Sequence, residues 1–166
     1  HRGYRLLLQT FDSAWGGFGA APKFPTPHNL LFLMRMHEAE KLPEALYMAE
    51  VTLKAMAEGG IFDQIGGGSS RYSTDQRWLA PHFEKMLYDN ALLLLAYLEA
   101  FQLTQKAFYA DVAKRTAGYI LRELASPEGG FYCGQDADSD GVEGKYYVFT
   151  PDEVKSVLGE DAGKEF

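Results

Sequence analysis

Apolar residues recur at helical spacing in four long segments of the chain, and the segments form two pairs with short connections. The first pair covers residues 27–42 and 43–58, and the second covers residues 81–103 and 106–125. Proline is a typical first helical residue, and Pro27, Pro43 and the proline at position 81 stand at three of the four starts. Helix after helix with so few intervening residues predicts antiparallel helical hairpins.

The two members of each pair differ in how their apolar residues are distributed. The second members are amphipathic, which is typical of helices on the outside of a domain. In residues 81–103 the leucines point in nearly every direction, and such a helix is expected to be buried on all sides. We therefore expect an inner and an outer layer, with the inner helix starting at Pro81 after Ala80 as N-cap.

Three loops open on a diglycine, at Gly16, Gly59 and Gly129, each placed after an outer helix and before an inner one. This recurrence indicates an internal repeat. The two longer loops predict short β-hairpins, with a strand over residues 146–149, and Thr150 with Glu153 predicts the capping box of a short helix. The predicted fold class is all-α: an (α/α) toroid of helical hairpins, of which the 166 residues form one incomplete domain, roughly the first half.

Composition limits the function classes. The net charge of −7, with no basic cluster longer than Lys114-Arg115, disfavours binding to nucleic acid or to an anionic membrane. The single Cys133 excludes an internal disulfide and fits a reducing compartment, so we expect a cytoplasmic location. No phosphate-binding loop or dinucleotide fingerprint is present, and we predict no cofactor and no metal.

Ionisable and aromatic side chains gather around the start of the predicted inner helix and in the two longer loops. A helix start offers free N–H groups, and aromatic rings with carboxylates and amides suit a sugar. The candidate catalytic residues are His82, Glu84, Asp89, Asp63 and Asp136. The candidate substrate-binding residues from these segments are Gln64, Arg71, Tyr72, Asp75, Trp78, Lys85, Tyr88, Asn90 and Asp138.

A second interpretation of the same residues is structural. Buried polar groups must be paired, so the cluster is equally well explained as a network that ties the helix to its loops, with Lys85 and Asp89 paired at one-turn spacing. The acidic segment matches the first half of a calcium loop, but Tyr147 stands where the last ligand, a glutamate, belongs. Asp136, Asp138 and Glu143 are then expected to line the cavity or to cap turns.

Three ordered strings resemble the spermatogenesis-associated protein 20 family over about residues 11 to 159. They are "GGFGAAPKFPTP", "GGIFDQIGGGSSRYSTDQRWLAPHFEKMLYDN" and "GGFYCGQDADSDGVEGKYYVFTPDE". The resemblance implies a thioredoxin-like domain before this segment and further hairpins after it. It also adds Lys23 and Phe24 to the substrate-binding candidates.

The resemblance implies a toroid similar to those of glycoside hydrolases and of N-acylglucosamine 2-epimerase, which leaves two hypotheses. The first is a sugar-active site that binds a small carbohydrate, either a hydrolase with two carboxylates or an isomerase with His82 as base. The second is a non-catalytic scaffold or peptide-binding module that works with the thioredoxin-like domain.

Overall fold

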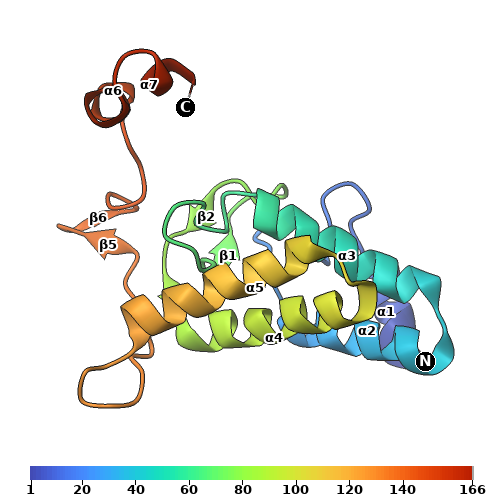
Figure 1. Cartoon of the computed structure of the whole chain (residues 1–166). Helices are drawn as coiled ribbons and strands as arrows, with labels where there is room; N and C mark the ends of the chain where they lie inside the picture. Colours follow the sequence, from blue (N-terminus) through green and yellow to red (C-terminus); the bar gives the residue numbers. More distant parts are fainter. Residues whose placement is uncertain (166) are drawn as a thin grey trace.

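In residues 1–165, which the computed structural model describes, four long helices form two hairpins (Figure 1). The helices are α2 (Pro27–Glu40), α3 (Pro43–Glu58), α4 (Leu87–Thr104) and α5 (Ala107–Tyr119). Helix α2 packs against α3 and α4, and α4 packs in turn against α5. The first member of each pair is therefore the inner helix, as its sequence predicts.

The buried positions of the outer helices follow the helical repeat. In α3 they are Ala45, Met48, Ala49, Thr52, Leu53, Met56 and Ala57, and in α5 they are Tyr109, Val112, Ala113, Thr116 and Tyr119. This spacing turns one stripe of each helix toward the inner layer. The Tyr97 hydroxyl on α4 donates a hydrogen bond of 2.9 Å to the Leu53 carbonyl on α3, which ties the two hairpins together.

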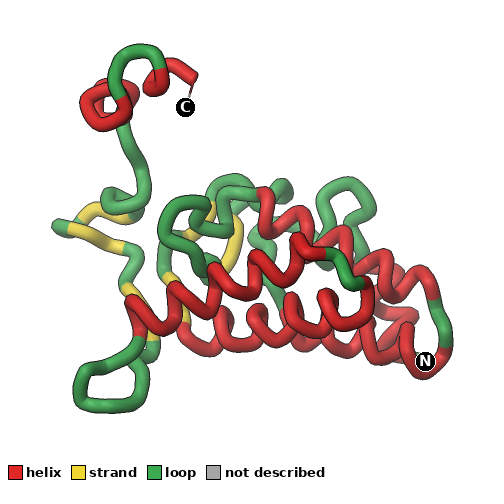
Figure 2. Tube along the Cα trace, viewed as in Figure 1, coloured by secondary structure: helices red, strands yellow, loops and turns green. Residues whose placement is uncertain are grey.

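Shorter elements connect and extend the hairpins. The helical ones are α1 (Arg2–Thr10), a π-helix that continues α5 over Ile120–Leu124, α6 (Pro151–Leu158) and α7 (Ala162–Glu165). The strands pair antiparallel: β1 (Tyr72–Ser73) with β2 (Pro81–His82), β3 (Lys85–Met86) with β4 (Gly134–Gln135), and β5 (Asp138–Ser139) with β6 (Val142–Glu143). Figure 2 shows them among the loops, toward the end of the helices that lies away from the N-terminus.

Helix α4 begins later than its sequence predicts. Residues 81–86 are extended, because β2 pairs with β1 and β3 pairs with β4. The Leu87 amide donates to the Cys133 carbonyl at 2.9 Å, which satisfies one of the free N–H groups at the helix start. The predicted start at Pro81 is therefore wrong, and the polar residues before Leu87 are on strands and their connections.

The acidic segment forms a hairpin in a different place from the predicted one. Asp140 and Gly141 join β5 to β6 with φ angles of 52° and 74°, and two positive angles are what the type I′ turn favoured by Asp-Gly requires. Residues 146–149 are turn and irregular chain, so the strand predicted there is wrong. The capping box between Thr150 and Glu153 is confirmed.

One side of α4 is buried and the other is exposed. Its core-facing residues include Leu93, Ala96, Tyr97 and Ala100, whereas Leu92, Leu95 and Leu98 are exposed by 36%, 53% and 39%. The expectation of burial on all sides is met only toward α2 and α5. Helices α6 and α7 contact each other and stand apart from the hairpins (Figure 1). Within residues 1–165, no helix combines the length and apolar character needed to cross a bilayer.

Candidate functional site

Lys23 is buried beneath the first diglycine loop. Its ammonium donates hydrogen bonds of 2.6 Å to Asp12 Oδ2 and of 2.6 Å to the Gly16 carbonyl, and it lies 5.5 Å from the centre of the Trp78 ring. Burial opposes ionisation of Asp12, but hydrogen bonds from Lys23, Gln76 and backbone amides outweigh it and hold the pKa of Asp12 at about 2. The Lys23 ammonium is therefore buried and engaged with groups of the first loop.

Lys85 and Asp63 form a matching pair beneath the second loop. Lys85 donates to Asp63 Oδ2 at 2.7 Å and to the Gly67 carbonyl at 2.9 Å, between the rings of Tyr119 and Tyr147. Burial lowers the pKa of Lys85, although Asp63 opposes that shift. Burial would raise the pKa of Asp63, but Lys85 and loop amides outweigh it and lower the value. Asp63 thus anchors a loop rather than offering a free carboxylate.

Gln64 and Asp75, both predicted to bind substrate, hold backbone. The Gln64 amide donates to the Ala57 carbonyl at 2.9 Å and to two further carbonyls that follow α3. The Asp75 carboxylate accepts from the Arg77 and Ala80 amides, each at 2.5 Å. Both side chains therefore stabilise the loop that leads into β2.

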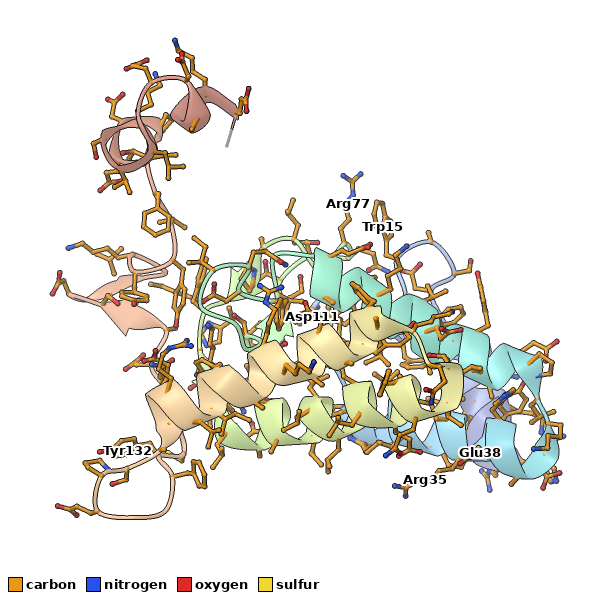
Figure 3. All side chains as sticks on the ribbon, viewed as in Figure 1. Trp15, Arg35, Glu38, Arg77, Asp111 and Tyr132 are labelled. Atoms are coloured by element: carbon orange, nitrogen blue, oxygen red, sulfur yellow. The ribbon has the colours of Figure 1, made fainter. Side chains whose placement is uncertain are left out.

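Asn90 and Trp78 have the same structural character. Asn90 is fully buried and exchanges two hydrogen bonds with the Ser69 backbone, at 2.7 and 2.9 Å. Trp78 is fully buried and donates through Nε1 to the Trp15 carbonyl at 2.8 Å. Figure 3 shows Trp15 itself at the surface beside Arg77, whose guanidinium lies 5.0 Å from the ring centre.

The remaining predicted residues come together on the accessible side of the loops. Arg71 Nη1 donates to Glu84 Oε2 at 2.8 Å, and the Arg71 amide donates to the Glu84 carbonyl at 2.8 Å. His82 places Nε2 3.9 Å from the same Glu84 oxygen and Nδ1 2.7 Å from Glu143 Oε1. The imidazole is thus held between two carboxylates, one on its own segment and one on β6.

Two aromatic rings lie in a row beside this histidine, with Tyr72 next to it and Phe24 beyond Tyr72. Tyr72 pairs with His82 across β1 and β2, and their rings lie 4.9 Å apart at an interplanar angle of 20°. Phe24 lies 4.9 Å from Tyr72 and is 48% exposed, so it offers accessible ring surface. Tyr88, at the start of α4, is equally exposed. These aromatic groups remain available to a ligand, unlike Trp78.

Asp89 adds a third carboxyl to the group. Its Oδ2 is buried and has no hydrogen-bond partner in residues 1–165. Burial raises the pKa of Asp89 to about 6; the Arg71 charge opposes the shift and the Glu84 charge adds to it. The predicted pairing with Lys85 is wrong, because Lys85 binds Asp63 instead. We call Arg71, His82, Glu84, Asp89 and Glu143 the histidine cluster.

Asp136 and Asp138 do not join the histidine cluster. Both are exposed, and Asp136 Oδ1 accepts from the Asp138 amide at 3.1 Å, at the entry to the β5–β6 hairpin. In the described part of the chain, no three His, Cys, Asp or Glu side chains gather closely enough to hold a metal ion. The spacing that imitates a calcium loop is here the spacing of a turn.

A cavity of about 800 Å³ lies on the other side of the 82–85 segment. Successive side chains of an extended segment point to opposite sides. His82 and Glu84 therefore lie in the histidine cluster, whereas Phe83 and Lys85 line the cavity on the other side. Its other walls come from the second loop and from residues 147–164. The cavity is therefore separate from the histidine cluster, although three other predicted site residues, Asp63, Gln64 and Lys85, line it.

The sequence does not predict the roles of two residues, Asp12 and Glu143. Asp12 was missed, although the Phe-Asp that precedes the first diglycine recurs at Phe62-Asp63 and is a usable signal. Glu143 was expected only to line a cavity or cap a turn, because its approach to His82 depends on the fold of a hairpin 61 positions away. No model of a known protein family matches the chain.

The fold is similar to those of several solved sugar-active enzymes. A sugar epimerase from a ruminal bacterium aligns over 98% of this chain and 41% of its own, with a TM-score of 0.73 and 16% identity. A cellobiose 2-epimerase from Bacillus thermoamylovorans aligns over 97% and 49%, with a TM-score of 0.71 and 15% identity. A family 76 α-mannanase from Bacteroides thetaiotaomicron aligns over 72% and 33%, with a TM-score of 0.59 and 19% identity.

At these identities the similarity shows the fold, which is the (α/α) toroid of the six-hairpin glycosidase-like class. Human spermatogenesis-associated protein 20 is 48% identical over 170 residues, which cover 96% of this chain and 22% of the human protein. The rat protein is 45% identical over 172 residues, which cover 98% and 22%. The chain belongs to the spermatogenesis-associated protein 20 family and spans about a fifth of the length of these relatives.

Proposed function

We propose that the toroid of the full-length protein binds a carbohydrate at the histidine cluster and transfers a proton next to the sugar carbonyl, as an isomerase or epimerase does. One observation carries the proposal: the His82 ring is fixed by a carboxylate on Nδ1, stacks on Tyr72, and presents Nε2 to a partly exposed polar site. Sugar-active enzymes among the structural neighbours support it at the level of the fold.

The chemistry follows from the tautomer in which Nδ1 carries the proton and donates it to Glu143. Nε2 then has a free electron pair and accepts the proton from the carbon next to the carbonyl. The C–H electron pair forms the double bond of an enediolate, and the carbonyl oxygen takes up the negative charge beside Arg71. Return of a proton to the opposite face of that carbon, with Asp89 as donor, gives the epimer.

Phe24 and Tyr72 supply the binding surface in this proposal. Aromatic rings stack on the apolar face of a pyranose, while Glu84 and Arg71 bond hydroxyl groups around its edge. Lys23, Gln64, Trp78, Lys85 and Asn90 stabilise the loops and have no direct part in binding.

Glycoside hydrolysis is the second candidate, because Asp89 and Glu84 have different environments. Burial raises the pKa of Asp89 to about 6, whereas Glu84 is held by the Arg71 guanidinium at 2.8 Å. A carboxyl with a raised pKa beside a second carboxyl group is the arrangement that glycoside hydrolysis uses. Here Asp89 protonates the glycosidic oxygen and Glu84 acts as base or nucleophile.

The test uses the full-length protein in D₂O with D-glucose, D-mannose or cellobiose. An epimerase exchanges the proton at C2 with solvent, so the C2 proton signal disappears, and the His82→Asn variant loses this exchange. His37→Asn is the matched control, because His37 lies near the C-terminal end of α2, where its Nδ1 bonds the Leu42 carbonyl. Release of reducing ends from glycosides without C2 exchange would select the hydrolase instead.

A scaffold role remains the alternative outcome. The charges of the cluster are paired with one another, Arg71 with Glu84 and His82 with Glu143, as a structural network requires. Absence of sugar binding by calorimetry, of C2 exchange and of glycoside cleavage would leave that interpretation standing and would overturn the sugar site.

A further inference from the structure

The first two diglycine loops are built in the same way, atom by atom. In the first, the Asp12 amide donates to the Gly17 carbonyl at 3.0 Å and the Gly16 amide donates to the Asp12 carbonyl at 2.8 Å. In the second, Asp63 and two glycines make the same two bonds, at 2.9 and 3.0 Å. In both, Oδ1 of the aspartate accepts from the amides two and three residues further on. The hydrogen-bond repeat therefore aligns Gly16-Gly17 with Gly67-Gly68, and not with the diglycine at Gly59 that opens the second loop in the sequence.

A buried lysine closes each loop from below. Lys23 bonds the Asp12 carboxylate and the Gly16 carbonyl, and Lys85 bonds the equivalent Asp63 carboxylate and Gly67 carbonyl. The two lysines are 1% and 2% exposed. We call each aspartate, its glycines and its lysine an Asp-Lys lock.

In each lock, one aromatic ring contacts both the lysine and a glycine. Trp78 lies beneath Lys23, and a Cβ at Gly17 would come within 2.6 Å of that ring. Tyr119 lies 4.7 Å from the Lys85 ammonium, and a Cβ at Gly68 would come within 2.5 Å of its ring. Both glycines have positive φ, at 80° and 78°. Glycine is required at these positions for close approach as well as for backbone conformation.

The third diglycine loop has a similar turn, one residue shorter, without a lock. Ser126 stands in place of the aspartate and bonds the Gly130 carbonyl through its amide at 3.1 Å, but no lysine approaches it in residues 1–165. Nothing lies within 4 Å of a Cβ added at Gly129 or Gly130, and Phe131 is 52% exposed. Figure 3 shows the neighbouring Tyr132 on the outside of this loop. The lock is therefore an addition to the turn and not a requirement for it.

The two locks stand at the two ends of the segments that carry the candidate site. Lys23 precedes Phe24, and Lys85 follows Glu84, so alternation along an extended chain places each lysine inside and its neighbour outside. The segments are joined between the locks: Lys23 pairs with Ser73, and Tyr72 pairs with His82. The rings beside His82 and the Glu84 side chain therefore lie on segments that Lys23 and Lys85 hold at their ends.

The first loop also forms hydrogen bonds with the segment that leads into β2. Gln76 donates to Asp12 Oδ2 at 2.7 Å, and Trp78 donates to the Trp15 carbonyl at 2.8 Å. The second lock acts on the exit of the same segment through Lys85. A shift of either lysine is therefore expected to change the spacing between Phe24 and Glu84.

We propose that Lys23 and Lys85 are positioning residues: the two Asp-Lys locks set the geometry of the histidine cluster without touching a ligand. A buried ion pair often gives no more stability than apolar residues of equal volume. We therefore assign the two pairs a role in fixing one conformation of the loops. Only the sugar-binding arm of the test rests on the function proposed above.

The test follows the exchange of the imidazole C2 proton with D₂O, residue by residue, by mass spectrometry of the full-length protein. Lys85→Met and Lys23→Met are each expected to change the exchange rate at His82 by about threefold or more, because the ring loses its fixed surroundings, and to leave His37 unchanged. Lys114→Met, at an exposed position on α5, is the control and leaves both histidines unchanged.

Where a single variant does not fold, Lys85→Met with Asp63→Asn removes both charges and keeps the measurement possible. An unchanged rate at His82 in a folded variant would overturn the proposal, and so would an equal change at His82 and His37, which signals general loosening. If sugar binds, its Kd weakens by about tenfold in the same variants. The exchange readout needs no sugar, so failure of the proposed function leaves it interpretable.

Discussion

His82 Nδ1 lies 2.7 Å from Glu143 Oε1, although 61 positions of sequence separate the two residues. The contact links the second loop to the β5–β6 hairpin and fixes which nitrogen of the ring faces the site. Both side chains are partly exposed, at 27% and 49%, and a pair of this kind contributes little to the free energy of folding. Its effect is therefore expected in chemistry rather than in stability.

Glu143→Gln is expected to change the free energy of unfolding by less than about 1 kcal/mol and to lower the rate of sugar C2 exchange by about tenfold or more. The reason is that the amide no longer fixes the ring in its proton-accepting orientation. Denaturant unfolding and NMR of the full-length protein measure the two quantities. Glu128→Gln, on the exposed third loop, serves as control. A loss of stability that accounts for the lost rate would contradict the assigned role.

Lys85→Met is expected to destabilise the protein by roughly 3 to 5 kcal/mol, because it leaves Asp63 charged and covered. Lys145 offers a matched comparison. It also bonds an aspartate, Asp140, at 2.7 Å, but these side chains are 55% and 80% exposed, against 2% and 17% for Lys85 and Asp63. Lys145→Met is therefore expected to change stability by less than about 1 kcal/mol. Urea unfolding of both variants compares burial at constant geometry, and equal losses would show that burial is not the cause.

The helical hairpins are predictable from the sequence because their signals are local. The prolines, the 3.6-residue period and the diglycine after Glu58 define α3 as residues 43–58, and the structure has the same bounds. The amphipathic outer helices are likewise assigned from their own residues. The capping box at Thr150 is a third case in which three or four neighbouring residues contain the whole signal.

The candidate site is only half predictable, because its geometry depends on distant partners. The sequence predicts too early a start for α4 because Pro81 fits an extended chain as well as a helix. Only the pairing of residues 81–86 with Ser73 and Gly134 decides between the two. The sequence does not reveal the partner of Lys85, because Asp63 lies 22 positions earlier. The sequence does not distinguish a polar loop residue that is exposed to solvent from one that is buried and paired.

Acid is expected to weaken the first lock through Asp12. Its pKa of about 2 in the folded protein is below its ordinary value of 3.8, so ionisation favours the folded state. This contribution is complete above about pH 5 and is lost as the pH falls through 4 toward 2, with roughly 1 to 2 kcal/mol at stake after allowance for solvent screening. Asp12→Asn is expected to flatten that limb of the stability curve. An unchanged acid limb, measured by denaturant unfolding between pH 2 and 6, would exclude Asp12 as its source.

Asp89 is expected to act in the opposite direction. Its pKa of about 6 in the folded protein is above the ordinary 3.8, so the folded state favours the protonated carboxyl, and stability falls as the pH rises from 4 through 6. Because Oδ2 is buried without a partner, Asp89→Asn removes the cost of ionisation and is expected to stabilise the protein by roughly 1 to 2 kcal/mol at pH 8 but hardly at all at pH 4. Unfolding of both proteins at the two pH values tests this, with Asp111→Asn, on the exposed face of α5, as control. Equal stabilisation at pH 4 and pH 8 would mean that the amide gains a new contact, and the raised pKa of Asp89 would then have no part in it.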